Sequence, residues 1–255
     1  MKYLIISILF SLLSYASPIE LAPKLTLNSM PKALVDKIDW CQNTQLHVDA
    51  NGLWILSQTN LLRLDKPGKA LMAPLHATSF SLTKSGHPIA IIDDRLGLIR
   101  HGIFLPGPKL PDTGYSLVQG QNDTLYVYNP QKIAPIYRFD GQTIRSIAQP
   151  NQPVLALSAL GDGIVFATKE GIFALQENKP LALVMPLSEF EPITSLAVNP
   201  QTAEIFVGTP HTVYSLNANV MVPLVSGIGG AIAFYDNRLW IADASLRQVY
   251  IVTPQ

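Results

Sequence analysis

The chain has 255 residues, of which 48% are hydrophobic and only 14% charged, with 18 basic and 18 acidic side chains. This balanced, low charge excludes electrostatic capture of nucleic acid or of an anionic membrane as a main function. Cys41 is the single cysteine, so an intramolecular disulfide is excluded and the fold depends on its hydrophobic core.

The first sixteen residues have the pattern of a secretory signal peptide. Lys2 precedes a mostly apolar run from Leu4 to Leu13, and Ser14-Tyr15-Ala16 has the small-x-small pattern of a cleavage site. The run is shorter than the about 20 residues that span a bilayer. We therefore expect cleavage after residue 16, no transmembrane segment in the mature chain, and export to the periplasm or the extracellular space. The alternative interpretation of residues 1–16 is a buried N-terminal strand or helix.

Residues 17–45 are predicted to form a closing strand and a connection. Within them only Pro31 to Trp40 could make a short helix, with Ser29 as a possible cap and Pro31 in the first turn. The stretch from Thr26 to Gln45 is longer than the other connections, and we expect it to contact a partner or simply to link the closing strand to the first repeat.

A motif recurs six times between residues 46 and 255. A short apolar run leads through a polar turn into a second apolar run, which ends on a small polar residue, and a third run follows. The second runs are spaced 34 to 41 residues apart and begin at Leu53, Ile89, Leu125, Ile164, Ile205 and Leu239. Such a period indicates a repeat architecture, and β-branched and aromatic runs between turns indicate strands.

A fourth, proline-bearing run follows five of the units. These runs are Leu71–Leu75, Ile103–Leu110, Thr143–Pro150, Leu183–Leu187 and Val220–Leu224. Proline is tolerated in sheets at edges, so this run is the predicted outer strand. Unit six has no such run, but Ile19–Leu25 (IELAPKL) matches the pattern. We expect this segment to be the outer strand of the last unit, the alternative being a disordered tail.

Four-stranded antiparallel units repeated radially make a β-propeller, and the length fits six blades. The sequence therefore predicts an all-β, six-bladed propeller whose ring is closed by an N-terminal strand. The expected organisation is a signal peptide at 1–16, the closing strand and connection at 17–45, and the propeller at 46–255.

Two units carry a family resemblance. The last unit, IAFYDNRLWIADASLRQVYIV, resembles the NHL-repeat blade, and LHVDANGLWIL in the first unit is similar to it. More broadly, the chain resembles the six-bladed propellers that group NHL proteins with the regucalcin/gluconolactonase family. The resemblance implies the architecture. It also implies a possible metal-activated lactonase chemistry, because enzymes of the regucalcin kind use an acidic and amide ligand set.

Each second run is followed by a short polar residue four positions after its start. These residues are Ser57, Asp93, Asn129, Thr168, Thr209 and Asp243. One interpretation is a ring of oxygen-bearing ligand groups around the central opening. The other is that each side chain bonds the backbone amides of its own hairpin turn. We call these six residues the polar ladder.

Within the polar ladder, Asp93, Asn129 and Asp243 are candidate ligands for Ca²⁺ or another divalent cation, since hard cations take carboxylate and amide oxygens. The chain lacks the early-blade glutamate and the Asn-Gly-rich loops of the regucalcin family. Its five histidines show no metal-ligand spacing, and neither a GxSxG nor a Walker motif occurs. No catalytic residue and no other cofactor is predicted.

The sequence thus favours an exported, non-catalytic propeller that acts as a protein-interaction or scaffold module, for example in an envelope assembly, with an unidentified protein partner. Two alternatives stay open: a metal-dependent lactonase or hydrolase, and a binder of a carbohydrate or another small ligand. Aromatic residues of the second runs are expected to pack between blades; they are Trp54, Tyr126, Phe166, Phe206 and Trp240.

Overall fold

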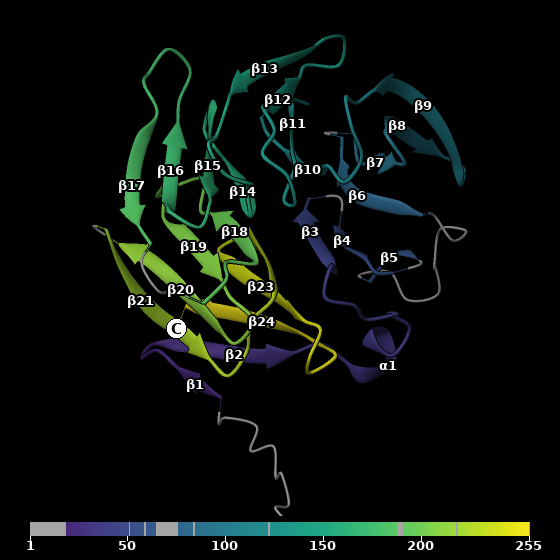
Figure 1. Cartoon of the computed structure of the whole chain (residues 1–255). Coiled ribbons are helices and arrows are strands. Elements are labelled where there is room, and N and C mark those ends of the chain that lie inside the picture. Colours follow the sequence, from purple (N-terminus) through teal and green to yellow (C-terminus); the bar gives the residue numbers. More distant parts are fainter. Residues whose placement is uncertain are drawn as a thin grey trace, which may run out of the picture.

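The computed structural model describes residues 19–50, 52–58, 60–64, 76–83, 85–121, 123–187, 191–217 and 219–254. These residues form six antiparallel sheets arranged in a ring and a single short helix (Figure 1). The predicted all-β, six-bladed propeller is confirmed. The predicted signal peptide, residues 1–16, lies outside the described residues.

Within each blade the chain runs from the innermost strand to the rim, and neighbouring strands are antiparallel. Blade one consists of β3 (Gln45–Asp49), β4 (Gly52–Leu56) and β5 (Leu61–Arg63). Blade two consists of β6 (Ala77–Leu82), β7 (Pro88–Ile92), β8 (Arg95–Arg100) and β9 (Ile103–Lys109). Blade three consists of β10 (Ser116–Gln119), β11 (Leu125–Tyr128), β12 (Ile136–Phe139) and β13 (Ile144–Ala148).

Blades four to six have the same order. Blade four consists of β14 (Ala156–Leu160), β15 (Gly163–Ala167), β16 (Gly171–Leu175) and β17 (Ala182–Pro186). Blade five consists of β18 (Ser195–Val198), β19 (Ile205–Gly208), β20 (Thr212–Asn217) and β21 (Val220–Ser226). Blade six consists of β22 (Ala231–Tyr235), β23 (Arg238–Asp243) and β24 (Gln248–Pro254), with an N-terminal segment as its outer strand. The outer strands predicted in blades two to five are β9, β13, β17 and β21. The one predicted in blade one, Leu71–Leu75, lies outside the described residues.

An N-terminal strand closes the ring, but it lies further along the chain than predicted. The outer strand of blade six is β2 (Leu25–Ser29), with Leu27 opposite Val252. The preceding β1 (Glu20–Leu21) instead pairs with β21 of blade five, with Glu20 opposite Ser226. The predicted closing segment, 19–25, was therefore placed wrongly. Pro23 and Lys24 form a turn, with Lys24 at φ +65, and this turn carries the chain from one blade to the next.

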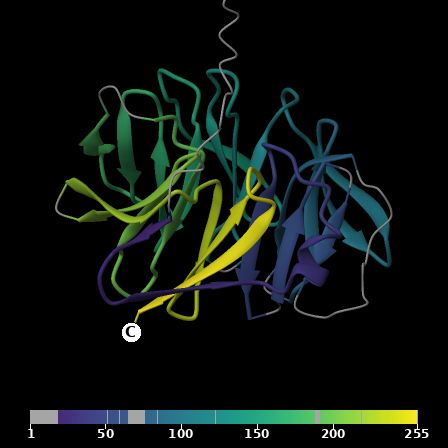
Figure 2. The same cartoon turned by 90° about the horizontal axis from the view of Figure 1, so that it is seen from below.

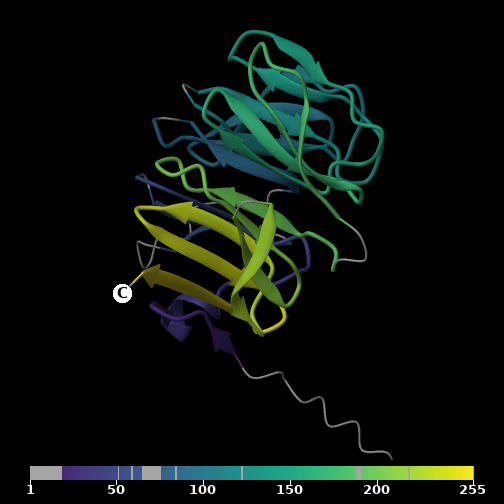
Figure 3. The ribbon, with the colours of Figure 1, turned by 90° about the vertical axis from the view of Figure 1, so that its left-hand side faces the viewer.

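Figures 2 and 3 show the N-terminal strands lying along the outside of the last blades. Leu21, Leu25 and Leu27 pack against the apolar cluster between blades five and six. The N-terminal segment therefore fastens two neighbouring blades to each other as well as completing the ring.

The predicted short helix is present as α1 (Lys32–Val35). Ser29 is not its cap, because Ser29 ends β2; Pro31 occupies the N-cap position and no side chain caps the helix. Val35 and Ile38 are buried in the cluster between blades six and one. In the described part of the chain, no helix has the length and hydropathy of a membrane span.

The core consists of apolar clusters between adjacent blades, as expected when a blade cannot bury its two faces alone. Four of the five predicted second-strand aromatic side chains are buried, and Trp240 is half-buried; the four are Trp54, Tyr126, Phe166 and Phe206. Their predicted interblade packing is confirmed.

Replacing Leu27 by Ala should lower the free energy of unfolding by about 1–3 kcal/mol, because Leu27 packs, half-buried, where β2 closes the ring. The neighbouring Asn28 is exposed, so Asn28→Ala on the same strand is the control and should change stability by less than about 0.5 kcal/mol. Chemical denaturation of the full chain measures both. Equal effects would mean that the packing of β2 does not stabilise the ring.

Candidate functional site

A central cavity of about 790 Å³ lies where the six innermost strands converge. Its wall consists of β3, β6, β10, β14, β18 and β22, joined by residues 41–44 and by the ends of β4 and β11. Each innermost strand pairs on one side only, because it stands at the end of its sheet. The unpaired backbone edges of six strands therefore face the same space.

The described side chains that line this cavity include no Asp, Glu, Lys or Arg. Most polar ones are hydroxyl or amide groups: Gln42, Asn43, Thr44, Gln45, Ser57, Gln58, Thr78, Ser79, Ser81, Ser116, Gln119, Gln131, Ser158, Thr194 and Ser195. Burial raises the pKa of both lining phenols, Tyr115 and Tyr128, to about 12, so they stay neutral near pH 7. The cavity offers hydrogen-bonding groups and little charge.

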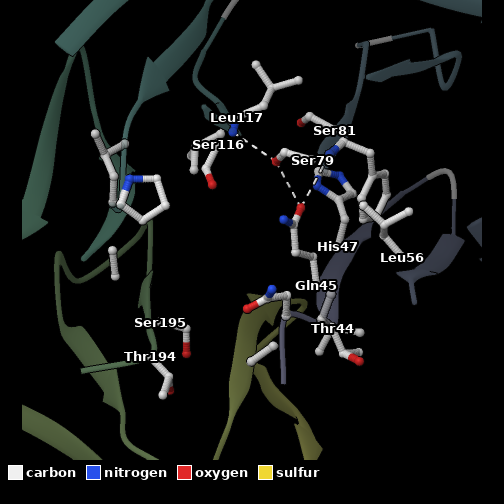
Figure 4. Close-up of a pocket in the computed structure, with 18 of the residues that line it drawn as sticks. Thr44, Gln45, His47, Leu56, Ser79, Ser81, Ser116, Leu117, Thr194 and Ser195 are labelled. Atoms are coloured by element: carbon white, nitrogen blue, oxygen red, sulfur yellow. Dashed lines mark hydrogen bonds between the residues drawn. The ribbon is translucent and has the colours of Figure 1, made fainter. Parts of the chain in front are cut away.

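On one side of the cavity a polar network connects blades one, two and three (Figure 4). The amide oxygen of Gln45 accepts from the Ser79 hydroxyl at 2.9 Å and from the Phe80 backbone N–H at 3.3 Å. The Ser79 oxygen accepts in turn from the Leu117 N–H at 2.9 Å. Gln45 also donates to the Thr78 carbonyl at 3.0 Å. This network holds neighbouring inner strands at a fixed separation.

A second set of hydrogen bonds, made by the Thr194 and Ser195 side chains, lies across the cavity at the junction of blades five and six. The Thr194 and Ser195 hydroxyls both donate to the Gly230 carbonyl, at 2.9 and 2.6 Å. Ser195 also accepts from the Ile232 N–H at 3.2 Å. Figure 4 shows both residues facing Gln45 from the opposite wall.

His47 and Ser81 lie two residues further along the same two strands as Gln45 and Ser79. The His47 ring meets the Phe80 ring edge-on at 6.2 Å, and its Nε2 lies 3.4 Å from a carboxylate oxygen of Asp49. Both His47 and Ser81 line the cavity. Among the described residues His47 is the one histidine of the cavity lining, to which the other four histidines do not belong.

The polar ladder does not converge on the cavity. Five of its members are buried where their second strand ends, and Asp93 is exposed in the hairpin turn between β7 and β8, at φ +57. Among the described lining residues, Ser57 is the ladder's single representative. A ligand-binding role for the ladder stays a prediction.

The buried ladder members bond their own turns, as the second interpretation anticipates. Ser57 donates to the Asn60 carbonyl, and Thr209 bonds both the carbonyl and the N–H of Thr212. The Asn129 oxygen accepts from two backbone N–H groups, at 2.9 and 3.0 Å. The Thr168 hydroxyl accepts from the Glu170 N–H at 3.1 Å. Each side chain thus pairs with a backbone N–H or C=O group of its own turn.

Asp243 makes the most extensive set of these bonds. One carboxylate oxygen accepts from the Ser245 N–H and hydroxyl and from the Leu246 N–H, at 2.6 to 2.9 Å. The other accepts from the Gly229 N–H at 3.0 Å. A Cβ at Gly229 would lie 2.1 Å from the Thr209 carbonyl oxygen, so this tight entry to β22 requires glycine. Asp243 therefore ties blade six to the turn that enters it.

The candidate metal ligands do not fit a cation as a set. Asp93, Asn129 and Asp243 belong to blades two, three and six, and the oxygens of the last two already accept backbone hydrogen bonds. Within the described residues, no group of three or more His, Cys, Asp or Glu side chains is arranged to hold a metal. We derive no chemistry through a metal from these residues.

Apart from Ser57, the polar residues that line the cavity were not predicted from the sequence. Most of them belong to the first runs of the repeats, whereas the candidate residues were taken from the ends of the second runs. A signal was present, since small polar residues recur in the first runs at Ser79, Ser81, Ser116, Thr194 and Ser195.

No protein-family model matches the chain, and no curated protein matches it in sequence. Solved structures do match in fold. Virginiamycin B lyase from Staphylococcus aureus aligns over 91% of this chain and 100% of its own at 12% identity, with a TM-score of 0.64. A gluconolactonase from Xanthomonas campestris aligns over 91% and 90% at 11% identity, with a TM-score of 0.62.

Two further matches come from Bacteroides. An auxiliary nutrient binding protein from Bacteroides ovatus aligns over 91% of this chain and 77% of its own, at 12% identity and a TM-score of 0.61. An extracellular domain from B. thetaiotaomicron aligns over 83% and 32%, at 13% identity and a TM-score of 0.55. The chain is thus a six-bladed propeller of the architecture found in gluconolactonases, as predicted. At such low identity the likeness shows the fold alone.

Replacing Asp243 by Ala should destabilise the protein by about 2–4 kcal/mol, because it leaves the buried Gly229 N–H and three donors of the turn at Ser245 and Leu246 without their acceptor. The matched control is Asp93→Asn, which keeps a residue that tolerates positive φ at an exposed turn and should change stability by less than about 0.5 kcal/mol. Thermal and urea unfolding measure both. A neutral Asp243→Ala variant would contradict the turn-anchoring role.

Proposed function

We propose that the protein is an exported, non-catalytic propeller that binds a neutral, hydroxyl-rich small ligand, such as a carbohydrate, in its central cavity. The observation that carries this proposal is the neutral, hydrogen-bonding lining of that cavity. Hydroxyl and amide side chains both donate and accept, which complements ligands that do the same. The volume of about 790 Å³ falls within the usual range for small-molecule sites.

The lining also supports binding without turnover. An ionic ligand would lose its hydration without a compensating charge among the described lining groups, which favours an uncharged one. General acid–base catalysis needs a positioned group that exchanges a proton near neutral pH; among the described lining residues His47 is the single histidine, and the two lining tyrosines are held neutral. A binding role also has a counterpart in fold, the nutrient binding protein from B. ovatus.

Export is supported by the signal-peptide pattern of residues 1–16. The match to an extracellular domain is in keeping with it. A site for an environmental or envelope-derived ligand would then face the compartment in which that ligand occurs.

Neutral sugars should raise the melting temperature of the mature protein, because a ligand at 100 times its dissociation constant adds about 2.7 kcal/mol, or about 5–10 °C at this size. Maltose, cellobiose and N-acetylglucosamine are suitable probes in differential scanning fluorimetry. Glucuronate is the charged control and should have no effect. Calcium tests the lactonase alternative: a rise with calcium and none with any sugar would replace our proposal with a metal-dependent one.

A second candidate function, docking to a protein partner, is favoured by apolar side chains exposed on the outer strands. Ile103 and Leu105 on β9, Leu183 on β17, and Val220 and Val222 on β21 are 45–63% exposed. Contiguous exposed apolar groups often mark interaction sites, and β9 and β21 each carry two such side chains two residues apart, on the same face of the strand. This candidate places the partner at the rim and leaves the cavity free.

Crosslinking in the cells of origin tests the partner candidate. The double variant Ile103→Thr and Val222→Thr should lose any crosslinked species, because it removes apolar contact area from the rim. It should unfold within about 1 kcal/mol of the parent, since both side chains are exposed in the isolated chain. Crosslinks that persist unchanged would remove the rim from consideration.

A further inference from the structure

We infer that hydroxyl groups of the neutral ligand bind the backbone edges of two adjacent innermost strands, β14 of blade four and β18 of blade five; this inference rests on the proposed cavity function. At β14 one hydroxyl donates to the Leu155 carbonyl and accepts from the Leu157 N–H. At β18 a second hydroxyl bonds the Thr194 carbonyl and the Leu196 N–H in the same way. The ligand thus takes the place that a side chain of the preceding blade has elsewhere in the ring.

The first observation is a repeated bridge between neighbouring blades. The Gln45 amide of blade one donates to the Thr78 carbonyl and accepts from the Phe80 N–H of blade two, at 3.0 and 3.3 Å. The Ser79 hydroxyl of blade two accepts from the Leu117 N–H of blade three at 2.9 Å. These backbone groups belong to innermost strands, each of which has a neighbouring strand on one side only. A side chain of one blade therefore completes the edge of the next.

Blade six shows that a single hydroxyl is enough for such a bridge. The Ser195 hydroxyl of blade five donates to the Gly230 carbonyl at 2.6 Å and accepts from the Ile232 N–H at 3.2 Å. A ligand hydroxyl has the same capacity, since it also donates one hydrogen bond and accepts others. Ser195 is thus an internal example of how a polyhydroxy ligand can bind an innermost edge.

The second observation is that the N–H groups of blades four and five lack this bridge. In each of blades three to six, one residue of the innermost strand pairs with the third residue of the second apolar run; these residues are Leu117, Leu157, Leu196 and Ile232. Because their register is the same, their N–H groups point away from the second strand alike. Serine oxygens accept from Leu117 and Ile232. Among the described residues, no side chain accepts from the N–H of Leu157 or Leu196.

The carbonyls of Leu155 and Thr194 have the position of the Thr78 carbonyl. In blade two, Thr78 is skipped in the pairing with β7, and its carbonyl bonds Gln45. Leu155 and Thr194 each donate their N–H, at 2.8 Å, to the second-strand residue that faces the next residue of the chain. Two residues facing one are a β-bulge, which leaves the extra residue outside the regular pairing. Neither carbonyl accepts a hydrogen bond from the described residues, so both are open to a ligand.

The sequence explains the missing bridges. Ala156 pairs with the last residue of β15, as Ser195 pairs with the last residue of β19, but alanine has no polar atom with which to bond blade five. In blade three the corresponding residue is Ser116, whose hydroxyl bonds the Tyr128 phenol of its own blade. Ala231 of blade six leaves the edge of blade one open in the same way. Of these three open edges, those of blades four and five stand side by side on one wall (Figure 1).

The chemistry of an open edge selects a hydroxyl group. The edge offers one acceptor and one donor two residues apart, and a hydroxyl satisfies both, whereas a ketone or carboxylate oxygen has no hydrogen to donate. The four residues that supply these groups all line the cavity: Leu155, Leu157, Thr194 and Leu196. Figure 4 shows Thr194 on the wall opposite Gln45, so a ligand on these edges lies across the cavity from the Gln45 network.

Backbone amide magnetic resonance of the full mature chain tests the inference, because each N–H gives its own signal. Xylitol, a small open-chain polyol, and maltose are the probes. We expect both to shift the Leu157 and Leu196 signals and to slow the exchange of these protons with solvent. Leu117 and Ile232 are the matched controls, because serine oxygens already bond their N–H groups, and their signals should stay in place.

Supplying the missing hydroxyl is the second test. Ala156→Ser places a hydroxyl where it can bond the Leu196 N–H, as Ser195 bonds the next blade, and should weaken xylitol binding about tenfold, the equivalent of one to two lost hydrogen bonds. Ala231→Ser is the control, since it supplies a hydroxyl to the edge of blade one and should leave xylitol binding unchanged. Equal affinities for Ala156→Ser and the parent would overturn the inference. If Ala156→Ser does not fold, the amide titration of the parent decides alone.

The remaining outcomes separate the inference from the proposed function. If sugars raise the melting temperature but the Leu157 and Leu196 signals do not move, the proposed function stands and the inference falls. If xylitol shifts both signals while no sugar binds, the inference stands and the carbohydrate proposal falls. Shifts of equal size at Leu117 and Ile232, or no shift with either probe, overturn the inference.

Discussion

The pairing of β2 with β24 is the constraint on which the rest of the structure depends. Every blade is apolar on both faces, and each face is covered by a neighbouring blade. In an open array the first and last blades would each leave one face in water. Closure joins residues 227 positions apart, and Thr26 and Thr253 bond each other across the seam at 2.5 Å. Covering both terminal faces is what offsets the entropy of joining the two ends of the chain.

Closure also builds part of the candidate site. The segment that leaves β2 passes through α1 and reaches the cavity at residues 41–44. There the buried Thr44 bonds the backbone of Cys41 in both directions, at 2.7 and 3.2 Å, which fixes the entry to β3. Gln45 begins that strand and carries the network to blades two and three. The N-terminal segment therefore positions the cavity wall as well as the ring.

The architecture was predictable from the sequence because the repeat is local: each unit places apolar runs and turn residues at similar spacings. The exact closing strand was not predictable, since it depends on how Pro23 and Lys24 turn the chain between two blades. Likewise, the polar ladder marked the turn positions correctly, but the pattern says nothing about whether an oxygen points to its own turn or to the centre. Ser79 and Ser81 look like ordinary strand residues until six strands converge.

The neutral lining follows from how a propeller builds its centre. Each innermost strand leaves one backbone edge unpaired, so the cavity already holds N–H and C=O groups from six strands. Gln45 shows what a side chain can do there, because it satisfies the Phe80 N–H and the Thr78 carbonyl with one amide. A ligand with closely spaced donors and acceptors would act on such edges in the same way. Under the proposed function, recognition in this cavity rests on hydrogen-bond matching and shape, and the shared scaffold leaves each propeller free to carry a different set of lining residues.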